Sequence, residues 1–157
     1  MKKNLEMYVD GACSGNPGEA AVGVVITDGQ EIIKNISERI GKATNNIAEY
    51  TALIFALQEA LILRANEVKV YTDSELMHNQ LKGEYKVKDA QLKSLYLQVQ
   101  HLVEGLRSFE IKLIPREQNG AADKLATQAL KKKQVKMVAL VRQRMLSVGE
   151  ESPSSAG

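Results

Sequence analysis

Four acidic residues stand where a carboxylate needs an explanation: Asp10, Glu49, Asp73 and Asp123. Asp10 and Asp73 each follow a short run in which apolar and polar residues alternate, which is the pattern of a β-strand. In an α/β sheet, binding sites are built at the ends of such strands and in the adjoining loops. Taken singly, each aspartate is better explained as a turn former or a helix cap.

Glu49 lies on the apolar face of a predicted helix, because alanine or leucine follows it three, four and seven positions later. A buried carboxylate is costly unless it is neutralised, paired or bound to a metal ion. The alternative is a glutamate favoured by the helix dipole in the first turn and angled to the rim of the core. Asp123, in the first turn of the last predicted helix, is unremarkable alone.

Considered together, the four acids need a common explanation. Three of them fall at strand-to-helix junctions or in first helical turns that one fold can bring together. Clustered carboxylates repel one another and favour hard divalent ions such as Mg²⁺ or Mn²⁺. Two such ions about 4 Å apart can activate water and stabilise a leaving oxygen in phosphodiester hydrolysis. The joint pattern therefore indicates nuclease chemistry.

The elements that must position these acids follow from hydrophobic periodicity. A strand that ends at Asp10 and stops at Gly11 precedes turn residues 11–18, and runs 20–26 and 31–40 complete an antiparallel three-strand meander. The chain then predicts helix 46–64, strand 68–72, a helix from Glu75, helix 90–106, strand 109–114, a polar loop 115–120 and helix 121–133. This order predicts an α/β fold with a five-stranded mixed sheet flanked by helices.

Composition sets the wider limits. A chain of 157 residues, 44% hydrophobic and 25% charged, has the balance of a single globular domain. Aromatic residues make up 4% and Trp is absent, so any nucleic acid would be held by its backbone. The net charge of +2 neither proves nor excludes a polyanionic partner. The single cysteine, Cys13, and the lack of a signal peptide or membrane-spanning run predict a cytoplasmic protein.

Four motifs, in this order, resemble those of the type-1 ribonuclease H family: Tyr8–Gly18, Thr44–Tyr50, Tyr71–Ser74 and Asn119–Ala126. The resemblance covers roughly residues 5 to 133. It implies a ribonuclease-H-like fold and an endonuclease that cuts the RNA strand of RNA/DNA hybrids. It also implies that the four acids hold two Mg²⁺ ions, with Mn²⁺ as a substitute, and that the products carry 5′-phosphate and 3′-hydroxyl ends.

The resemblance also assigns substrate contacts. Small and amide side chains would follow the minor groove of the hybrid and meet the 2′-hydroxyls that distinguish RNA from DNA. Thr44 and Asn45 would bind a DNA phosphate, although both also suit a helix cap. The full set of implied contacts is Gly11, Cys13, Ser14, Asn16, Thr44, Asn45, Asn46 and Ser74.

Two departures from the best-known members of the family stand out. The connection between Gln80 and Ala90 is too short for the basic, aromatic handle that many members carry, so substrate grip falls to other lysines and arginines. The candidates are Lys82, Lys86 and Lys88 or the tail residues Lys131, Lys132, Lys133, Lys136, Arg142 and Arg144, each of which could equally be a solvated surface charge.

The second departure is that the loop before Asp123 has no histidine. Arg116 is the candidate assisting group there, or else an ion-pair partner of Glu117.

These observations predict a catalytic domain over residues 1–133, a basic extension over 134–149 and a disordered tail over 150–157, in a monomer without a membrane segment. One alternative is a ribonuclease-H-like module that binds hybrid or structured RNA without cutting it, against which the four acids argue. A related polynucleotidyl transferase or junction nuclease would not need the 2′-hydroxyl contacts. A domain that binds nucleic acid through its basic tail is the third alternative.

Overall fold

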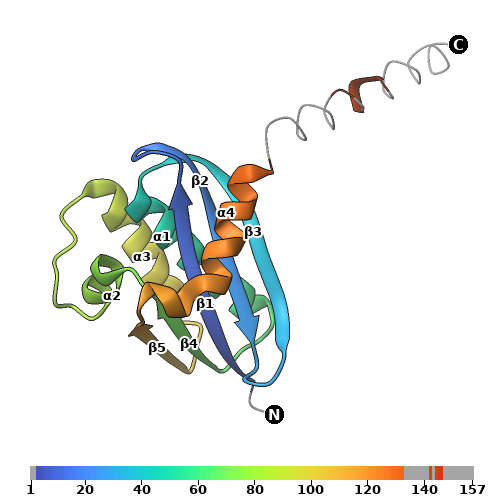
Figure 1. The fold of residues 1–157 in the computed structure, drawn as a ribbon. Helices are drawn as coiled ribbons and strands as arrows, with labels where there is room; N and C mark the ends of the chain where they lie inside the picture. The colour runs from blue at the N-terminus through green and yellow to red at the C-terminus, as the bar shows by residue number, and fades with distance from the viewer. Residues whose placement is uncertain (1–2, 133–141, 143, 147–157) are drawn as a thin grey trace, which may run out of the picture.

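The computed structural model describes residues 3–132, 142 and 144–146. Within them, a five-stranded mixed sheet in the order β3-β2-β1-β4-β5 is flanked by helices on both faces (Figure 1). The α/β architecture expected from the sequence is therefore confirmed. The extension predicted over 134–149 and the tail predicted over 150–157 lie outside the described residues, apart from residues 142 and 144–146.

The first three strands form the expected antiparallel meander: β1 is Asn4–Cys13, β2 is Gly18–Thr27 and β3 is Ile32–Ala43. On its other side, β1 pairs in parallel with β4 (Glu67–Thr72), which pairs in parallel with β5 (Ser108–Leu113). Helices provide the crossovers that parallel pairs require. The parallel pairing places the carboxyl end of β4 beside Tyr8, two residues before Asp10 in β1.

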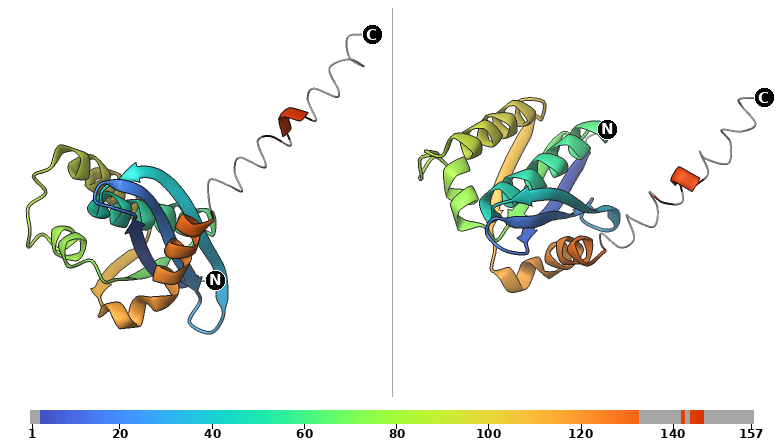
Figure 2. Two further views of the ribbon diagram at one scale, coloured as in Figure 1. Left: turned by 45° about the horizontal axis from the view of Figure 1, so that its top comes forward. Right: turned by 90° about the horizontal axis from the view of Figure 1, so that it is seen from above.

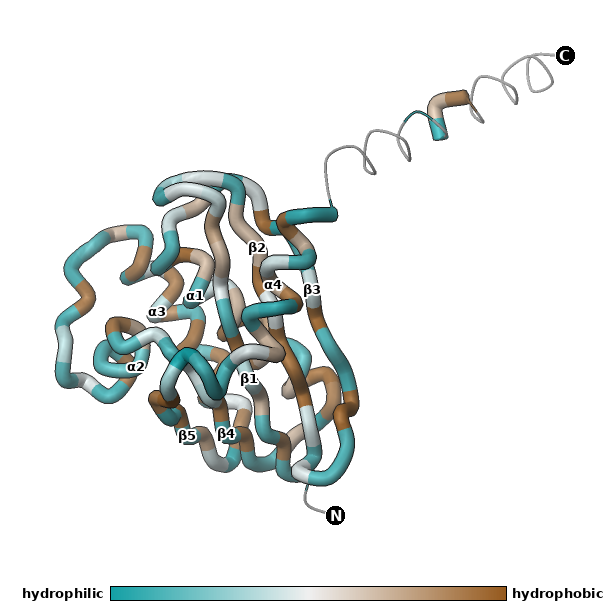
Figure 3. The backbone as a smooth tube through the Cα atoms, in the orientation of Figure 1, coloured by the Kyte–Doolittle hydropathy of each residue, from teal (hydrophilic) through white to brown (hydrophobic). Residues whose placement is uncertain are grey.

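Two layers of helix cover the sheet. α1 (Asn45–Ile62) and α3 (Ala90–Val103) lie on one face and α4 (Gly120–Lys131) on the other, as the view from above shows (Figure 2). The short α2 (Glu75–Leu81) follows β4, and the 3-10 helix η1 (Arg116–Asn119) leads into α4. Hydrophobic stretches concentrate in the central strands and helices, whereas the connection from α2 to α3 is mostly hydrophilic (Figure 3).

The core lies between the sheet and α1, because alternate residues of β1, Leu5, Met7 and Val9, point toward Leu53 and Leu57. α1 begins where Thr44 Oγ1 accepts a hydrogen bond from the Ile47 amide at 3.2 Å, which is an N-cap interaction. The side chain of Thr44 therefore fixes the start of the helix that carries Glu49.

α4 packs closely on β2 because Gly23 has no side chain. A Cβ at Gly23 would overlap the Ala122 carbonyl and lie 2.7 Å from the Ala126 amide nitrogen. Ser37 Oγ donates to the Leu125 carbonyl at 2.6 Å, which fastens the helix to β3 as well. This packing fixes the height of α4, and thus of Asp123, above the sheet.

The predicted end of the first strand is wrong. β1 continues past Asp10 and Gly11, because its antiparallel pairing with β2 runs on to Cys13 opposite Ala20. Only the parallel pairing with β4 stops early, at Tyr8 opposite Tyr71. The two strands therefore part just before Asp10.

Smaller differences concern element ends. β3 extends to Ala43, beyond the predicted 31–40, because Gly18 still pairs with Ala43. The predicted polar loop contains η1, and α3 ends at Val103 shortly before Gly105. None of the helices in the described part of the chain is long and apolar enough to cross a membrane.

Candidate active site

The four predicted carboxylates converge at one end of the sheet: Asp10 comes from β1, Glu49 from α1, Asp73 from the loop after β4 and Asp123 from α4. Oxygen atoms of Asp10, Glu49 and Asp73 lie within 4.8 Å of one another. Asp123, in the first turn of α4, is close enough for a side-chain hydrogen bond with Asp10. All four line one cavity of about 610 Å³. Residues that span more than a hundred positions of the chain thus form a single acidic site.

Glu49 is buried because α1 approaches β1 at Gly11. A Cβ on Gly11 would overlap the backbone of Ala48 and reach the Glu49 nitrogen, so only glycine permits this approach. The close approach lets the Gly11 amide donate a hydrogen bond to Glu49 Oε1. Only 9% of Glu49 is exposed, and its side chain lies both against the core and at the wall of the acidic cavity.

Burial and mutual repulsion alter the acid chemistry of the site. Burial raises the pKa of Asp10 to about 9, and the charges of Glu49 and Asp73 and the contact with Asp123 add to the shift. Burial raises the pKa of Glu49 to about 7, although the Gly11 amide and the positive charge of Arg116 act in the opposite direction. Without cations, the site therefore retains protons at neutral pH. An all-oxygen donor set of this kind fits hard divalent ions such as Mg²⁺.

The residues predicted to contact substrate fall into two groups. Six line the acidic cavity: Gly11, Cys13, Asn45, Asn46, Ser74 and the candidate assisting residue Arg116. The other three, Ser14, Asn16 and Thr44, are not among the residues that line it. These three residues lie within three positions of Cys13 or Asn45, which do line the cavity. Asn16 Oδ1 accepts a hydrogen bond from the Asn45 amide at 3.0 Å. The turn that precedes β2 is thereby tied to the start of α1.

Several of these side chains have structural partners. Ser74 Oγ accepts a hydrogen bond from the Met77 amide at 3.2 Å and caps α2. Cys13 Sγ donates to the Ala43 carbonyl at 3.2 Å, and burial followed by the charge of Glu49 raises the pKa of the thiol. A thiol with a raised pKa is a poor nucleophile. Capping and substrate contact remain compatible roles for Ser74.

Asn119 is a residue of the site that the sequence did not single out. It is 1% exposed, and its Nδ2 donates to the Val9 carbonyl at 2.9 Å and to Asp73 Oδ1 at 3.4 Å. It stands at the N-cap position of α4, yet its side chain makes no capping hydrogen bond. Ala12, Thr127 and Leu130 also line the cavity without having been predicted, and no sequence signal marks them.

The connection from α2 to α3 is short and well anchored. Buried Tyr50 donates through its hydroxyl to Gln80 Oε1 at 2.6 Å, and Gln80 Nε2 donates to the Lys86 carbonyl at 3.2 Å. The predicted absence of an inserted handle is confirmed in these residues. Lys82, Lys86 and Lys88 do not line the acidic cavity.

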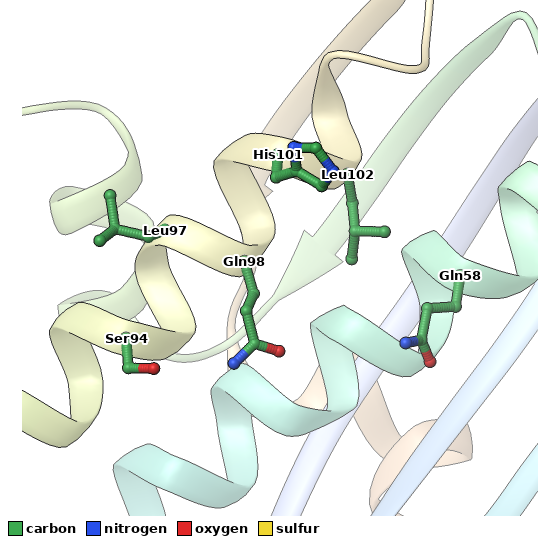
Figure 4. Close-up of a pocket in the computed structure, with 6 residues that line it drawn as sticks. All are labelled: Gln58, Ser94, Leu97, Gln98, His101 and Leu102. Carbon is green, nitrogen blue, oxygen red and sulfur yellow. The ribbon is translucent and has the colours of Figure 1, made fainter.

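A second cavity of about 400 Å³ lies between α1 and α3 and contains no carboxylate. Figure 4 shows Gln58 and Gln98 extending toward the space between the two helices. His101 lines this cavity, and His78 Nδ1 lies 2.8 Å from Asn79 Oδ1 on α2. Neither histidine lines the acidic cavity.

Comparisons with known proteins agree with this geometry. A family model described as "Reverse transcriptase-like" matches residues 8–129. The chain is 41% identical over 123 residues to the bifunctional protein Rv2228c of Mycobacterium tuberculosis, covering 77% of this chain and 34% of that protein. It is 40% identical over 127 residues to ribonuclease HI of Halobacterium salinarum, covering 80% of this chain and 64% of that protein. The chain thus spans about a third of the first relative and just under two thirds of the second.

Solved structures give the same result. The crystal structure of RNase H1 from Halobacterium salinarum has a TM-score of 0.81 at 38% identity, covering 83% of this chain and 99% of that one. LC11-RNase H1, solved in complex with an RNA/DNA hybrid, has a TM-score of 0.78 at 40% identity, covering 82% of this chain and 97% of that one. With its four ordered motifs and its converging acids, the chain belongs to the type-1 ribonuclease H family.

Proposed function

We propose that this protein is an endonuclease that hydrolyses the RNA strand of RNA/DNA hybrids and leaves 5′-phosphate and 3′-hydroxyl ends. The observation that carries the proposal is the convergence of Asp10, Glu49, Asp73 and Asp123 on one cavity. The solved complex of the related LC11-RNase H1 with a hybrid supports the choice of substrate. Convergence of all four acids argues against a module that only binds.

In this proposal, the four carboxylates hold two divalent ions, Mg²⁺ or Mn²⁺. Bound there, the ions would supply an activated water and stabilise charge on the leaving oxygen. Glu49 would be held by the Gly11 amide, and the α1 packing that buries it would keep one side of the site dry. Arg116, which lines the cavity, would add positive charge beside the scissile phosphate.

Recognition of RNA would come from the rim of the cavity. Gly11, Cys13, Asn45 and Asn46 line it and would allow close approach of the minor groove, with the amides meeting 2′-hydroxyls. Thr44 and Asn45, at the start of α1, would receive a DNA phosphate. Ser14, Asn16 and Ser74 complete the proposed contacts. Outside the cavity, the hybrid would be held by the exposed Lys82, Lys86 and Lys88 or by the basic residues between Lys131 and Arg144.

The test is cleavage of a labelled RNA strand annealed to DNA, in Mg²⁺ and in Mn²⁺, with single-stranded RNA as a substrate control. Asp10→Asn is expected to abolish cleavage without unfolding the protein. Asp28→Asn is the matched control, because Asp28 is an exposed turn residue at the opposite end of the sheet. Ligation and extension assays identify the product ends. Binding of the hybrid without cleavage in either metal would overturn the proposal in favour of a non-catalytic module.

A further inference from the structure

Asn119 lies where β1 and β4 part. The parallel register of the two strands ends at Tyr8 opposite Tyr71, so Val9 is the first residue of β1 beyond it. The Val9 carbonyl accepts its hydrogen bond from Asn119 Nδ2 at 2.9 Å instead of from β4. A side chain thus continues the hydrogen bonding of the sheet at the point where the site begins.

The same nitrogen reaches the acidic site. Asn119 Nδ2 lies 3.4 Å from Asp73 Oδ1 and is the one hydrogen-bond donor that the described residues offer to this carboxylate. By contrast, Glu49 has the Gly11 amide as its donor. Asp73 follows the last residue of β4, in a loop before α2 whose backbone is held by the hydrogen bond from the Ser74 amide to Thr72 Oγ1 at 3.0 Å. The backbone is therefore fixed locally, and Asn119 is the group that can fix the direction of the Asp73 carboxylate.

The orientation of the Asn119 amide is fixed by its partners. Val9 and Asp73 both present acceptors, so the NH₂ group must face them. The other end of the amide, Oδ1, is buried without a hydrogen-bond partner among the described residues. A buried unpaired acceptor lowers stability. An amide with this cost is better explained by what its two donated hydrogen bonds do than by packing alone.

Asn119 also connects to the two remaining aspartates. Val9 directly precedes Asp10, and Asn119 directly precedes α4, whose first turn contains Asp123. We propose that Asn119 is a positioning residue that holds Asp73, and with it the spacing to Asp10 and Asp123, at the geometry that divalent-ion binding requires. The inference rests on the proposed function, which gives the bound ions their role. Metal binding can be measured without cleavage and therefore tests the positioning role on its own.

The experiment measures metal binding and cleavage in parallel. Thermal stabilisation of the full chain by Mg²⁺ and by Mn²⁺ gives the half-saturating concentration, and hybrid cleavage gives kcat and KM at each metal concentration. The variants are Asn119→Ala, which removes the amide, and Asn119→Asp, which keeps its size but replaces the donor with an acceptor. Gln118→Ala is the matched control, since Gln118 is the exposed neighbour in η1.

Both Asn119 variants are expected to need roughly ten- to a hundredfold more metal for half-saturation, which is the usual effect of losing a group that orients a ligand. KM for the hybrid should change little, and high metal concentrations should restore part of kcat. In an Asp73→Asn background, Asn119→Ala should add little further loss of metal affinity, because the carboxylate that it orients is already gone.

Unchanged half-saturating metal concentrations in folded variants would overturn the inference. So would variants that fail to fold at every metal concentration, because Asn119 would then be a folding residue. If the unaltered protein binds metal but does not cut hybrid, the proposed function fails while the positioning role is still decided by the metal titration. If it cuts hybrid and the Asn119 variants match it throughout, the positioning role fails alone.

Discussion

Asp10 and Glu49 carry pKa values of about 9 and about 7, whereas their ordinary values are 3.8 and 4.5. The folded, metal-free protein therefore binds protons more tightly than the unfolded chain does. The stabilisation from these protons is complete below the unfolded pKa values and is lost as the pH rises through the folded ones. Repulsion among the ionised carboxylates thus lowers the stability of the metal-free protein, and bound cations would remove that repulsion.

We expect the melting temperature of the metal-free protein to fall by several degrees between about pH 5 and about pH 9, as Glu49 and then Asp10 lose their protons. Mg²⁺ should stabilise most at the upper end of this range, because it competes with protons for the same oxygens. Thermal melts across pH, with and without Mg²⁺, measure both effects. Asp10→Asn should flatten the metal-free curve; an equally steep curve in that variant would contradict this origin.

At the scale of single residues, the sequence predicted the acids but not what holds them. Glu49 could be identified because a carboxylate on an apolar helix face conflicts with its neighbours. Asn119 could not, because a polar residue before a helix is ordinary in sequence. Its burial arises only when η1 packs against β1. Asn119 and Val9, its partner in β1, are 110 positions apart in the chain.

At the scale of elements, the seating of α4 on β2 depends on Gly23, where any side chain would meet the helix backbone. Gly23→Ala should push α4 off the sheet, lower stability by about 1–3 kcal/mol and weaken metal binding through the displacement of Asp123. Gly120→Ala is the control, because a Cβ there meets nothing within 4 Å at the start of the same helix. Denaturant unfolding and metal titration of both variants provide the measurement, and equal effects at the two positions would contradict the packing argument.

Most elements were predictable because their periodicities are clear. Apolar residues alternate in β1 because every second side chain faces the core. In α1, leucine and alanine recur at helical spacing because one side of the helix packs against the sheet. The ends were less predictable, because β1 continues past Asp10 only through its pairing with β2. A turn-rich sequence from Gly11 to Gly18 hides that pairing. Tertiary partners, which single-sequence periodicity does not contain, decide where such strands end.

At the scale of the whole molecule, the acidic site joins residues 10 to 123, from β1, α1, α4 and the loop after β4. It is therefore complete only when the sheet and both helical layers are in place. We expect bound metal mainly to slow unfolding, because interactions formed late in folding act on that rate. At a metal concentration about 100 times the Kd, unfolding should slow by up to roughly 100-fold. Stopped-flow unfolding and refolding with and without Mg²⁺ measure this, and a comparable acceleration of refolding would show that the site forms early.

α4 is the one helix, among the described residues, that covers its face of the sheet, whereas α1 and α3 support each other on the opposite face. Such an element can open locally while the remainder stays folded, because its loss leaves the larger core between α1 and the sheet intact. Opening would remove Asp123 from the site but leave Asn45 and Asn46 in place on α1. Amide hydrogen exchange should therefore reveal a form in which the proposed hybrid contacts on α1 persist while the acidic site is disassembled. Divalent metal, if it binds between Asp123 and the other acids as proposed, should suppress that form.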